Sequence, residues 1–318
     1  MLLIVPCVLV FTACGAEGKG SKLATEAADA ARETVSSLDA SAVGGWKGLQ
    51  LDAKISASVK LPKDLAAALA AVAPEGTSVK ASMSAGASVS AKISGLDDET
   101  GAALKGTVVA SGSGELKDLA KANIYVDKDY IYDINAQTKE ANEEGAAGIF
   151  GGATDFLPGE DGDFDIAAVL ALVTEGAKEV YSAKSGKNTK YTFVYGTAEI
   201  LELVTPLLTA EEGLEVGPNS ILSTVLGMVD TFAEKINATI EVAVTLDEEG
   251  GLVALGVNAS VSVKLDAAEV IGEGAKGTIT VSGSASLTVK EFTGTVKAPK
   301  SQAVLDAYTL DYDAPSIG

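Results

Sequence analysis

The chain has 318 residues, of which 47% are hydrophobic, so it is long and apolar enough for one large domain with its own core. Its formal net charge of −20 disfavours nucleic acid as a partner, because phosphate backbones bind clustered positive charge. It has no histidine, which excludes Ser-His-Asp and Cys-His nucleophilic catalysis, histidine general bases and the usual zinc sites. These features favour a non-enzymatic protein without metal or cofactor.

A short apolar run from Leu2 to Phe11 opens the sequence. It has the length of a signal-peptide h-region and is too short to span a bilayer, which takes about 20 residues. The run ends in Phe11-Thr12-Ala13-Cys14, which resembles the lipobox of bacterial lipoproteins, with Phe11 where that family usually has leucine. The resemblance implies cleavage between Ala13 and Cys14, and a thioether-linked diacylglycerol on the Cys14 thiol, with acyl chains such as palmitate, as the membrane anchor. The alternative is an ordinary thiol at Cys14.

The resemblance divides the chain into a signal peptide at 1–13, a tether at 14–22 and a single domain at 23–318. The tether residues after the cysteine are small and polar, which predicts a flexible segment. We therefore expect an exported protein whose anchor holds it on a membrane outside the cytoplasm, at the cell surface or in the periplasm. Cys7 would be removed with the signal peptide, so no disulfide is expected.

The first part of the body alternates apolar and polar residues strictly, from Leu49 to Leu61 and again from Thr77 to Ser94. Such alternation predicts strands of an antiparallel sheet with one covered and one wet face. Their unusual length predicts a large curved sheet, with a bulge or bend at Gly86. Between them, Asp64 to Ala73 has apolar residues at helical spacing and predicts a short helix.

The middle of the chain begins with a predicted strand at Leu104 to Leu116 and a tight hairpin at Ile124 to Tyr132. The hairpin carries Tyr125, Tyr130 and Tyr132, which are more often cross-strand packing than a ligand platform. Residues Asn135 to Asp163 lack periodicity and predict a long loop.

The acidic run from Glu160 to Asp165 begins like a calcium loop but lacks the glycine and glutamate that an EF-hand requires. A looser oxygen-ligand site and a loop that caps a helix both remain open. The expected helix runs from Asp163 or Asp165 to about Ser182.

Further elements follow in the second half. Tyr191 to Tyr195 predicts a strand, Ala198 to Leu208 a short helix, and Gly217 to Lys235 a helix with one apolar stripe. The clearest hairpin joins two alternating runs between Ala238 and Leu265, and a last long strand spans Gly277 to Phe292. We expect Trp46 to seal one end of the core, and the glycosylation sequons at Asn237 and Asn258 to be chance matches within strands.

Two segments recur at nearly the same offset. Ala87 to Ile93 resembles Ala259 to Leu265, and Gly106 to Ser113 resembles Gly277 to Ser284. The echoes suggest two related halves at about 49–134 and 189–292, whereas alternating small residues also produce such echoes by themselves.

The hairpin residues Tyr125, Lys128, Tyr130 and Tyr132, together with long amphipathic strands and inserted helices, resemble the LolA/LppX-type lipoproteins. The resemblance implies an α+β fold: a large curved antiparallel β-sheet, an open half-barrel, with helices packed on its concave face. It also implies a cavity between sheet and helices that holds acyl chains. The candidate cavity residues are Met83, Val89, Tyr125, Tyr132, Leu222 and Phe232.

The leading hypothesis is therefore a membrane-anchored lipoprotein that binds a lipid or other hydrophobic ligand, as a carrier or for sequestration. The small residues Ala81, Ala85 and Ala87 fit either closely packed helices or a hollow left for that ligand. The alternative is a structural or adhesive surface lipoprotein with a solid core and no small ligand.

Overall fold

The structure is a computed structural model and describes residues 19–38, 46–72, 80–96, 103–117, 121–142, 170, 174–200, 235–271 and 275–310. The helices with described bounds are α1 (Thr25–Ser36), α2 (Lys63–Val72), α7 (Ala267–Ile271) and α8 (Gln302–Asp306). The strands are β1 (Ser21–Lys22), β2 (Gly48–Lys60), β3 (Ser82–Ser94), β4 (Lys105–Gly114), β5 (Lys121–Asp127), β6 (Tyr130–Asp133), β7 (Thr138–Ala141), β8 (Glu179–Ser185), β9 (Asn188–Gly196), β10 (Ile236–Leu246), β11 (Leu252–Asp266), β12 (Thr278–Glu291) and β13 (Thr309–Leu310).

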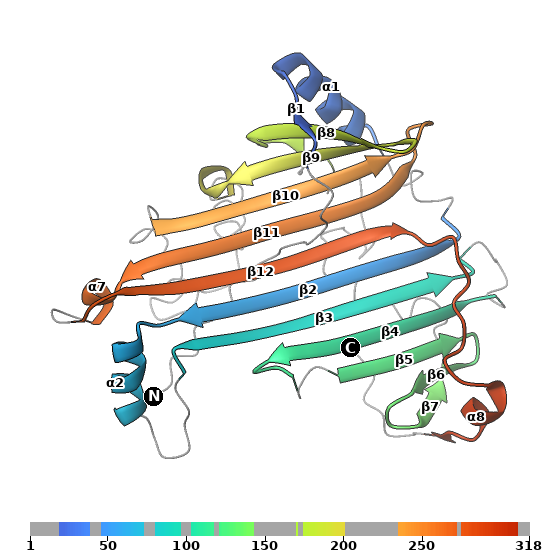
Figure 1. Cartoon of the computed structure of the whole chain (residues 1–318). Helices are drawn as coiled ribbons and strands as arrows, with labels where there is room; N and C mark the ends of the chain where they lie inside the picture. The colour runs from blue at the N-terminus through green and yellow to red at the C-terminus, as the bar shows by residue number, and fades with distance from the viewer. Residues whose placement is uncertain are drawn as a thin grey trace, which may run out of the picture.

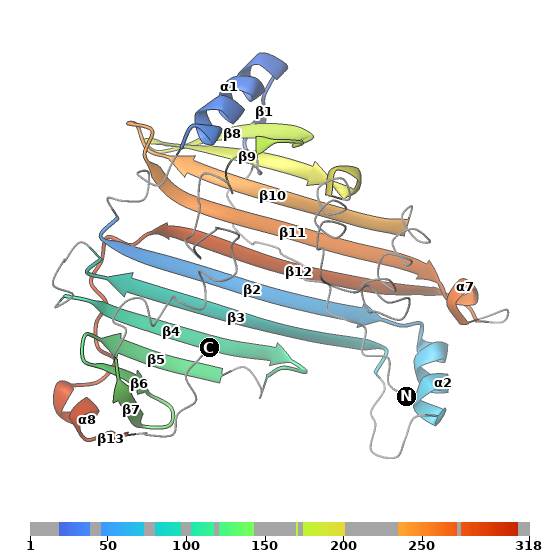
Figure 2. The ribbon, with the colours of Figure 1, turned by 180° about the vertical axis from the view of Figure 1, so that it is seen from behind.

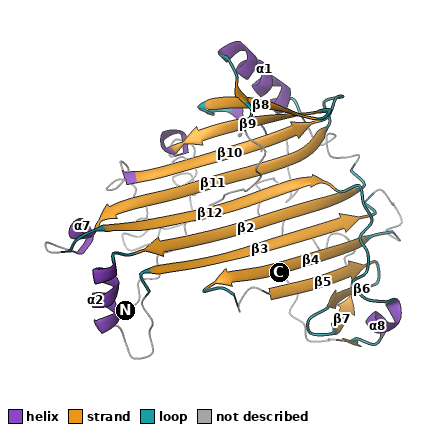
Figure 3. Cartoon of the chain, viewed as in Figure 1, coloured by secondary structure: helices purple, strands orange, loops and turns teal. Residues whose placement is uncertain are grey.

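These strands form one open sheet in the order β1-β8-β9-β10-β11-β12-β2-β3-β4-β5-β6-β7-β13 (Figure 1). Every pairing is antiparallel except that of β13 with β7. Figure 3 shows how little of the described chain is helical. The predicted fold class, an α+β fold built on a large, open, curved antiparallel sheet, is confirmed.

Residues that lie directly opposite one another on paired strands have their side chains on the same face of the sheet. The strand pairing therefore assigns each side chain to one of the two faces. One row across the central strands holds Val257, Leu287, Ala53, Val89 and Ala110, and the neighbouring row holds Asn258, Ser286, Lys54, Ser88 and Ser111. One face of the sheet is therefore apolar, and the other, which we name the hydroxyl face, is rich in serine and threonine.

The strands predicted from strict alternation are present with small changes at their ends. The hairpin of β10 and β11 has its predicted turn, where the Asp247 Oδ1 atom accepts hydrogen bonds from the backbone N–H groups of Glu249 at 2.9 Å and Gly251 at 2.7 Å. Gly250 has φ +88°, a left-handed backbone that glycine adopts without strain. The predicted helix at 64–73 is α2, and the tyrosine hairpin is β5 and β6.

Three predictions about local structure were wrong. The helix expected to run to Ser182 does not, because residues from Glu179 onward form β8, where Val180 enters the core beside Phe193. The long loop expected from Asn135 contains β7, which pairs with β6. Both errors have one cause: short strands lack the repeated alternation that reveals long ones.

The bulge or bend predicted at Gly86 is also absent, because the pairing of β3 runs through Gly86 without a shift on both sides. A Cβ atom there would lie 2.8 Å from the Ser113 hydroxyl and 3.0 Å from the Ile55 carbonyl oxygen. Gly86 thus permits a close approach between strands.

The internal repeat fits the sheet only in part. Ala259 of β11 and Ala87 of β3 lie in one row, on antiparallel strands that flank the β12–β2 pair symmetrically. The second echo falls on β4 and β12, which do not occupy such equivalent places. A duplication of two halves stays a prediction.

Two buried clusters lie at opposite ends of the sheet. The larger one lies on the apolar face, where α1 packs over β8, β9 and β10 with Val35, Leu170, Phe193 and Val244 all fully buried. Trp46 packs against this cluster, and its indole N–H donates to the Leu252 carbonyl oxygen at 2.9 Å, as expected of a residue that seals the core.

The smaller cluster consists of Tyr125, Tyr132, Val296, Leu305 and Tyr308. It lies on the hydroxyl face, where the chain after β12 crosses the sheet towards α8 (Figure 1). The Val296 N–H donates to the Ser94 hydroxyl at 3.1 Å and fixes this crossing.

Candidate functional site

The apolar face of β12, β2 and β3 is the best candidate for a ligand surface. Its side chains are small or aliphatic: one row joins Val281, Val59 and Met83, and another joins Ala285, Ile55 and Ala87. The charged residue on this face of β2, β3, β4, β11 and β12 is Glu291, at the end of β12.

Several described side chains on this surface are exposed, so the described part of the chain covers it incompletely. Ile55, in the middle of β2, is 47% exposed, and Ala57 beside it is exposed as well. Met83 and Val89 are half-buried, whereas Ala285 on the neighbouring strand is buried. An exposed apolar patch at the centre of a long sheet is typical of a binding surface.

The predicted cavity residues do not all meet on this surface. Met83 and Val89 lie on it, on β3. Tyr125 pairs with Thr107 and with Tyr132, so both tyrosines point to the hydroxyl face. Leu222 and Phe232, with the helix predicted around them, lie outside the described residues, as does the acidic run from Glu160 to Asp165.

The tyrosines pack with one another, as the hairpin predicted. The rings of Tyr125 and Tyr132 are stacked with centroids 5.6 Å apart, and the Tyr308 ring meets Tyr132 edge-on at 6.2 Å. Burial raises the pKa of Tyr132 to about 12, with a further contribution from the negative charge of Asp127. Tyr308 and Leu305 pack against these rings, so the tyrosines belong to a buried cluster.

Asp127 organises the hairpin. Its Oδ1 atom accepts from the backbone N–H groups of Asp129 and Tyr130, each at 2.9 Å, and its Oδ2 atom accepts from the Tyr132 hydroxyl at 3.3 Å. Tyr130 and Tyr132, which belong to the motif that resembles the LolA/LppX-type lipoproteins, are thus hydrogen-bonded within the hairpin itself.

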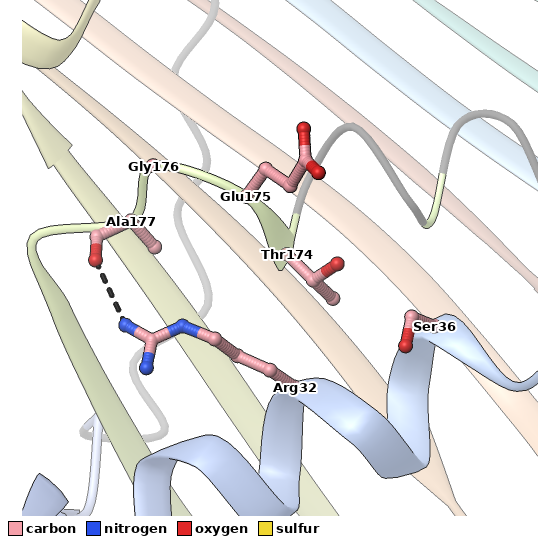
Figure 4. Close-up of a pocket in the computed structure, with 6 residues that line it drawn as sticks. All are labelled: Arg32, Ser36, Thr174, Glu175, Gly176 and Ala177. Atoms are coloured by element: carbon pink, nitrogen blue, oxygen red, sulfur yellow. Dashed lines mark hydrogen bonds between the residues drawn. The ribbon is translucent and has the colours of Figure 1, made fainter.

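A polar cleft of about 500 Å³ lies at the other end of the sheet, between α1 and the turn before β8 (Figure 4). Arg32, the single arginine of the chain, donates from Nη2 to the Ala177 carbonyl oxygen at 3.0 Å and from Nη1 to Asp29 at 2.8 Å. Sequence reasoning missed this cleft, although Ala28, Ala31 and Val35 follow helical spacing and could have revealed α1.

The cleft has the character of a packing junction. The Tyr195 hydroxyl donates to the Glu175 carbonyl oxygen at 3.1 Å beneath it, and burial raises the pKa of Tyr195. Arg32 joins α1 to the turn through the Ala177 carbonyl oxygen. Within the described ranges, no three Cys, Asp or Glu side chains gather as a metal ion would require.

The anchor prediction concerns Ala13 and Cys14, which lie outside the described residues. The end of the tether predicted at 14–22 is described, and it is docked on the sheet. Ser21 and Lys22 form β1 against β8, the Lys22 ammonium contacts Glu179 at 2.6 Å, and the Lys19 ammonium contacts Glu241 at 2.5 Å.

Gly20 makes this docking possible. Its φ is +83°, and a Cβ atom there would lie 2.1 Å from the Ser182 carbonyl oxygen. The last four residues of the predicted tether thus contact the sheet, an arrangement that alternation could not reveal over so short a length, and the flexibility of the tether stays a prediction. No described helix combines the length and apolar character needed to cross a membrane.

Comparisons with known proteins add no relative. No protein-family model and no curated protein matches the chain. Among solved structures, it is similar to an acetoacetate decarboxylase-like enzyme from Sphingomonas wittichii RW1, with 7% identity over 79% of this chain and 93% of the other and a TM-score of 0.11. The dehydratase domain from the terminal module of the rifamycin polyketide synthase has 12% identity over 73% and 74%, with a TM-score of 0.11. The enduracididine biosynthesis enzyme MppR has 6% identity over 76% and 85%, with a TM-score of 0.10. TM-scores this low give no information about fold or function.

Proposed function

We propose that this protein is a bacterial lipoprotein, anchored to a membrane through Cys14, that binds a lipid or another apolar ligand without chemical conversion. Its role is that of a carrier or a sequestering protein. The observation that supports the binding role is the incompletely covered apolar face of β12, β2 and β3, with Ile55 47% exposed at its centre. Figure 2 shows these three strands side by side at the centre of the sheet.

The chemistry of this face suits an acyl chain. Burial of each methylene contributes about 0.8 kcal/mol, and a surface of Ala, Val, Ile and Met offers no polar group that a hydrocarbon would leave without a hydrogen bond. Small side chains such as Ala53, Ala85 and Ala87 leave room above the sheet for a chain to lie across several strands.

A charged substitution on this face tests the proposal. The full chain should bind cis-parinaric acid, a fluorescent fatty acid, and Ile55→Glu should weaken binding about tenfold or more, because the carboxylate would be buried beneath the ligand. Val109→Glu is a matched control: Val109 is also 47% exposed but lies on the hydroxyl face, opposite Ser90. This control should bind like the unmodified chain.

Native mass spectrometry of the purified full chain should also detect a co-purifying lipid. Absence of both lipid and probe binding would refute the carrier role and support the alternative of a structural or adhesive surface lipoprotein with a solid core. Equal loss of probe binding in both variants would refute the apolar face as the site.

The anchor is tested separately. Metabolic labelling with an alkyne fatty acid should mark the unmodified protein and should vanish in Cys14→Ala. Label that persists in this variant would refute the anchor, whatever the outcome of the ligand experiments.

A further inference from the structure

The hydroxyl face of β11, β12, β2, β3 and β4 is built from rows of hydroxyl groups. One row joins Ser262, Ser282, Ser58 and Ser84, and another joins Ser260, Ser284, Ser56 and Ser113, with Gly86 between the last two. Neighbouring strands lie about 4.8 Å apart, and alternate residues along a strand about 6.7 Å apart, so the hydroxyls form a regular two-dimensional array. Figure 1 shows these five strands side by side.

Neighbouring hydroxyls hold one another in place across the strands. Ser58 and Ser282 are hydrogen-bonded at 2.8 Å, Ser88 and Ser111 at 2.8 Å, and Ser56 is bonded to Ser284. A serine hydroxyl has one donor and two acceptor positions, so a bonded pair still offers one donor and several acceptor positions to a partner. The array is therefore both ordered and able to bind.

Charge is distributed unevenly over the molecule. The hydroxyl face of these five strands carries six lysines and two aspartates, a net formal charge of +4, on a chain whose total is −20. The lysines are Lys54, Lys60, Lys92, Lys105, Lys264 and Lys290, and the aspartates are Asp52 and Asp266.

The two aspartates do not neutralise these lysines. The Asp52 carboxylate accepts from Ser90 and Gln50, each at 2.6 Å, and Asp266 accepts from the Ala268 N–H at 2.9 Å. Among the described residues, none of the six lysines forms an ion pair. Lys54, Lys60 and Lys264 are exposed, and the Lys92 ammonium lies 5.7 Å from the Phe292 ring centre.

We propose that this face binds an anionic polysaccharide, a polymer that combines sugar hydroxyls with carboxylate or phosphate groups. The serine and threonine array supplies hydrogen bonds to the sugar hydroxyls, and the lysines supply the attraction for the negative groups. The site is separate from the apolar face, so it stands independently of the ligand proposed there.

A lipid surface fits this face less well. Interfacial binding needs large apolar side chains that enter the acyl region, and the exposed large apolar residue on this face is Val109. Single-stranded nucleic acid needs aromatic rings on which bases stack, and the centre of this face carries serine instead.

Binding of alginate, a polyuronate, to the full chain tests the proposal by biolayer interferometry at low ionic strength. The triple variant Lys54→Glu, Lys60→Glu and Lys264→Glu should lose alginate affinity about tenfold or more, and 0.5 M salt should have a similar effect on the unmodified chain. Neutral dextran should bind at least tenfold more weakly than alginate.

The matched control is Lys63→Glu, Lys184→Glu and Lys187→Glu, which changes the charge equally at exposed lysines outside this face. It should keep its alginate affinity, and thermal melts should establish that both variants fold. Equal loss in the two variants would overturn the proposal. If the chain binds poly-L-glutamate as tightly as alginate, the proposed role of the sugar hydroxyls is overturned. If it binds phosphatidylglycerol vesicles more tightly than alginate, the proposal is overturned in favour of a membrane.

Discussion

The two ends of the sheet are closed in opposite ways. At the β8–β10 end, α1 covers the apolar face, and the aliphatic and aromatic side chains under it follow the alternation of the strands. At the β5–β7 end, the C-terminal chain covers the hydroxyl face, where Tyr125 and Tyr132 stand at positions that serine or lysine holds in the central strands.

The difference shows that one sheet can change its buried face along its width. Where aromatic side chains occupy polar positions, other residues cover that face: Leu305 of α8, and Tyr308 just after α8. Between the two ends, both faces carry exposed side chains, such as Ile55 on the apolar face and Val109 on the hydroxyl face, and the two proposed binding surfaces lie there. If the two clusters are independent, damage to one should leave the other intact.

The largest effect is expected at the α1 end. Phe193 is fully buried in the larger cluster, so Phe193→Ala should lower the free energy of unfolding by about 3–5 kcal/mol through lost burial and the remaining cavity. Urea denaturation of the full chain measures this loss, and hydrogen exchange should accelerate in α1 before it does in α8. A loss below about 1 kcal/mol would mean that α1 contributes little to the fold.

A smaller effect is expected at the α8 end. Leu305 is fully buried, but its cluster is small and lies at the margin of the sheet, so Leu305→Ala should cost about 2 kcal/mol. In this variant, amide hydrogen exchange should accelerate at residues 292–310 and not in α1. The double variant with Phe193→Ala should be additive within about 0.5 kcal/mol, and strong coupling would refute two separate clusters.

Much of this fold could be predicted because long strands repeat their signal many times. Each of β2, β3, β10, β11 and β12 alternates over more than ten residues, so both the strand and its apolar face were evident. β7 and β8 have 4 and 7 residues, and such short runs fit loop or helix equally well. For α1, whose apolar positions are mostly alanine, the pattern is weak without the sheet that it covers.

The candidate sites were predictable only in part. Alternation placed Met83 and Val89 on one face, but it could not place the tyrosine hairpin relative to them, because that depends on the strand pairing from β3 to β5. The hydroxyl face was implicit in the same alternation, yet its positive charge emerges only when lysines from several strands are brought together. The docking of residues 19–22 depends on a single backbone angle at Gly20.

Alkaline pH tests the burial of Tyr132 in the smaller cluster. The pKa of Tyr132 is raised to about 12, so the fold favours its neutral form. The stability this provides is complete below the ordinary tyrosine pKa near 10 and is lost as the pH rises towards 12. Tyr132→Phe should change the free energy of unfolding by no more than about 1 kcal/mol at pH 7. Between pH 9 and pH 11.5, urea denaturation should show that the variant loses less stability than the unmodified chain. Identical pH profiles for the variant and the unmodified chain would contradict this.

The smallest effect concerns the sheet edge beside α1, where β1 covers β8 as β13 covers β7 at the other edge. Gly20→Ala should undock β1, because its Cβ would collide with the Ser182 carbonyl oxygen, and the Leu23 N–H would then lose its 2.8 Å bond to the Val180 carbonyl oxygen. Global stability should hardly change, since two residues pair there.

The pKa of Glu179, lowered by its hydrogen bond from Lys22, should rise in the variant, which an NMR titration detects. Because that carboxylate is stabilised in the folded state, its contribution is present above its unfolded pKa and is lost as the pH falls, so the variant should lose less at low pH. An unchanged Glu179 titration would mean that β1 stays docked without its glycine.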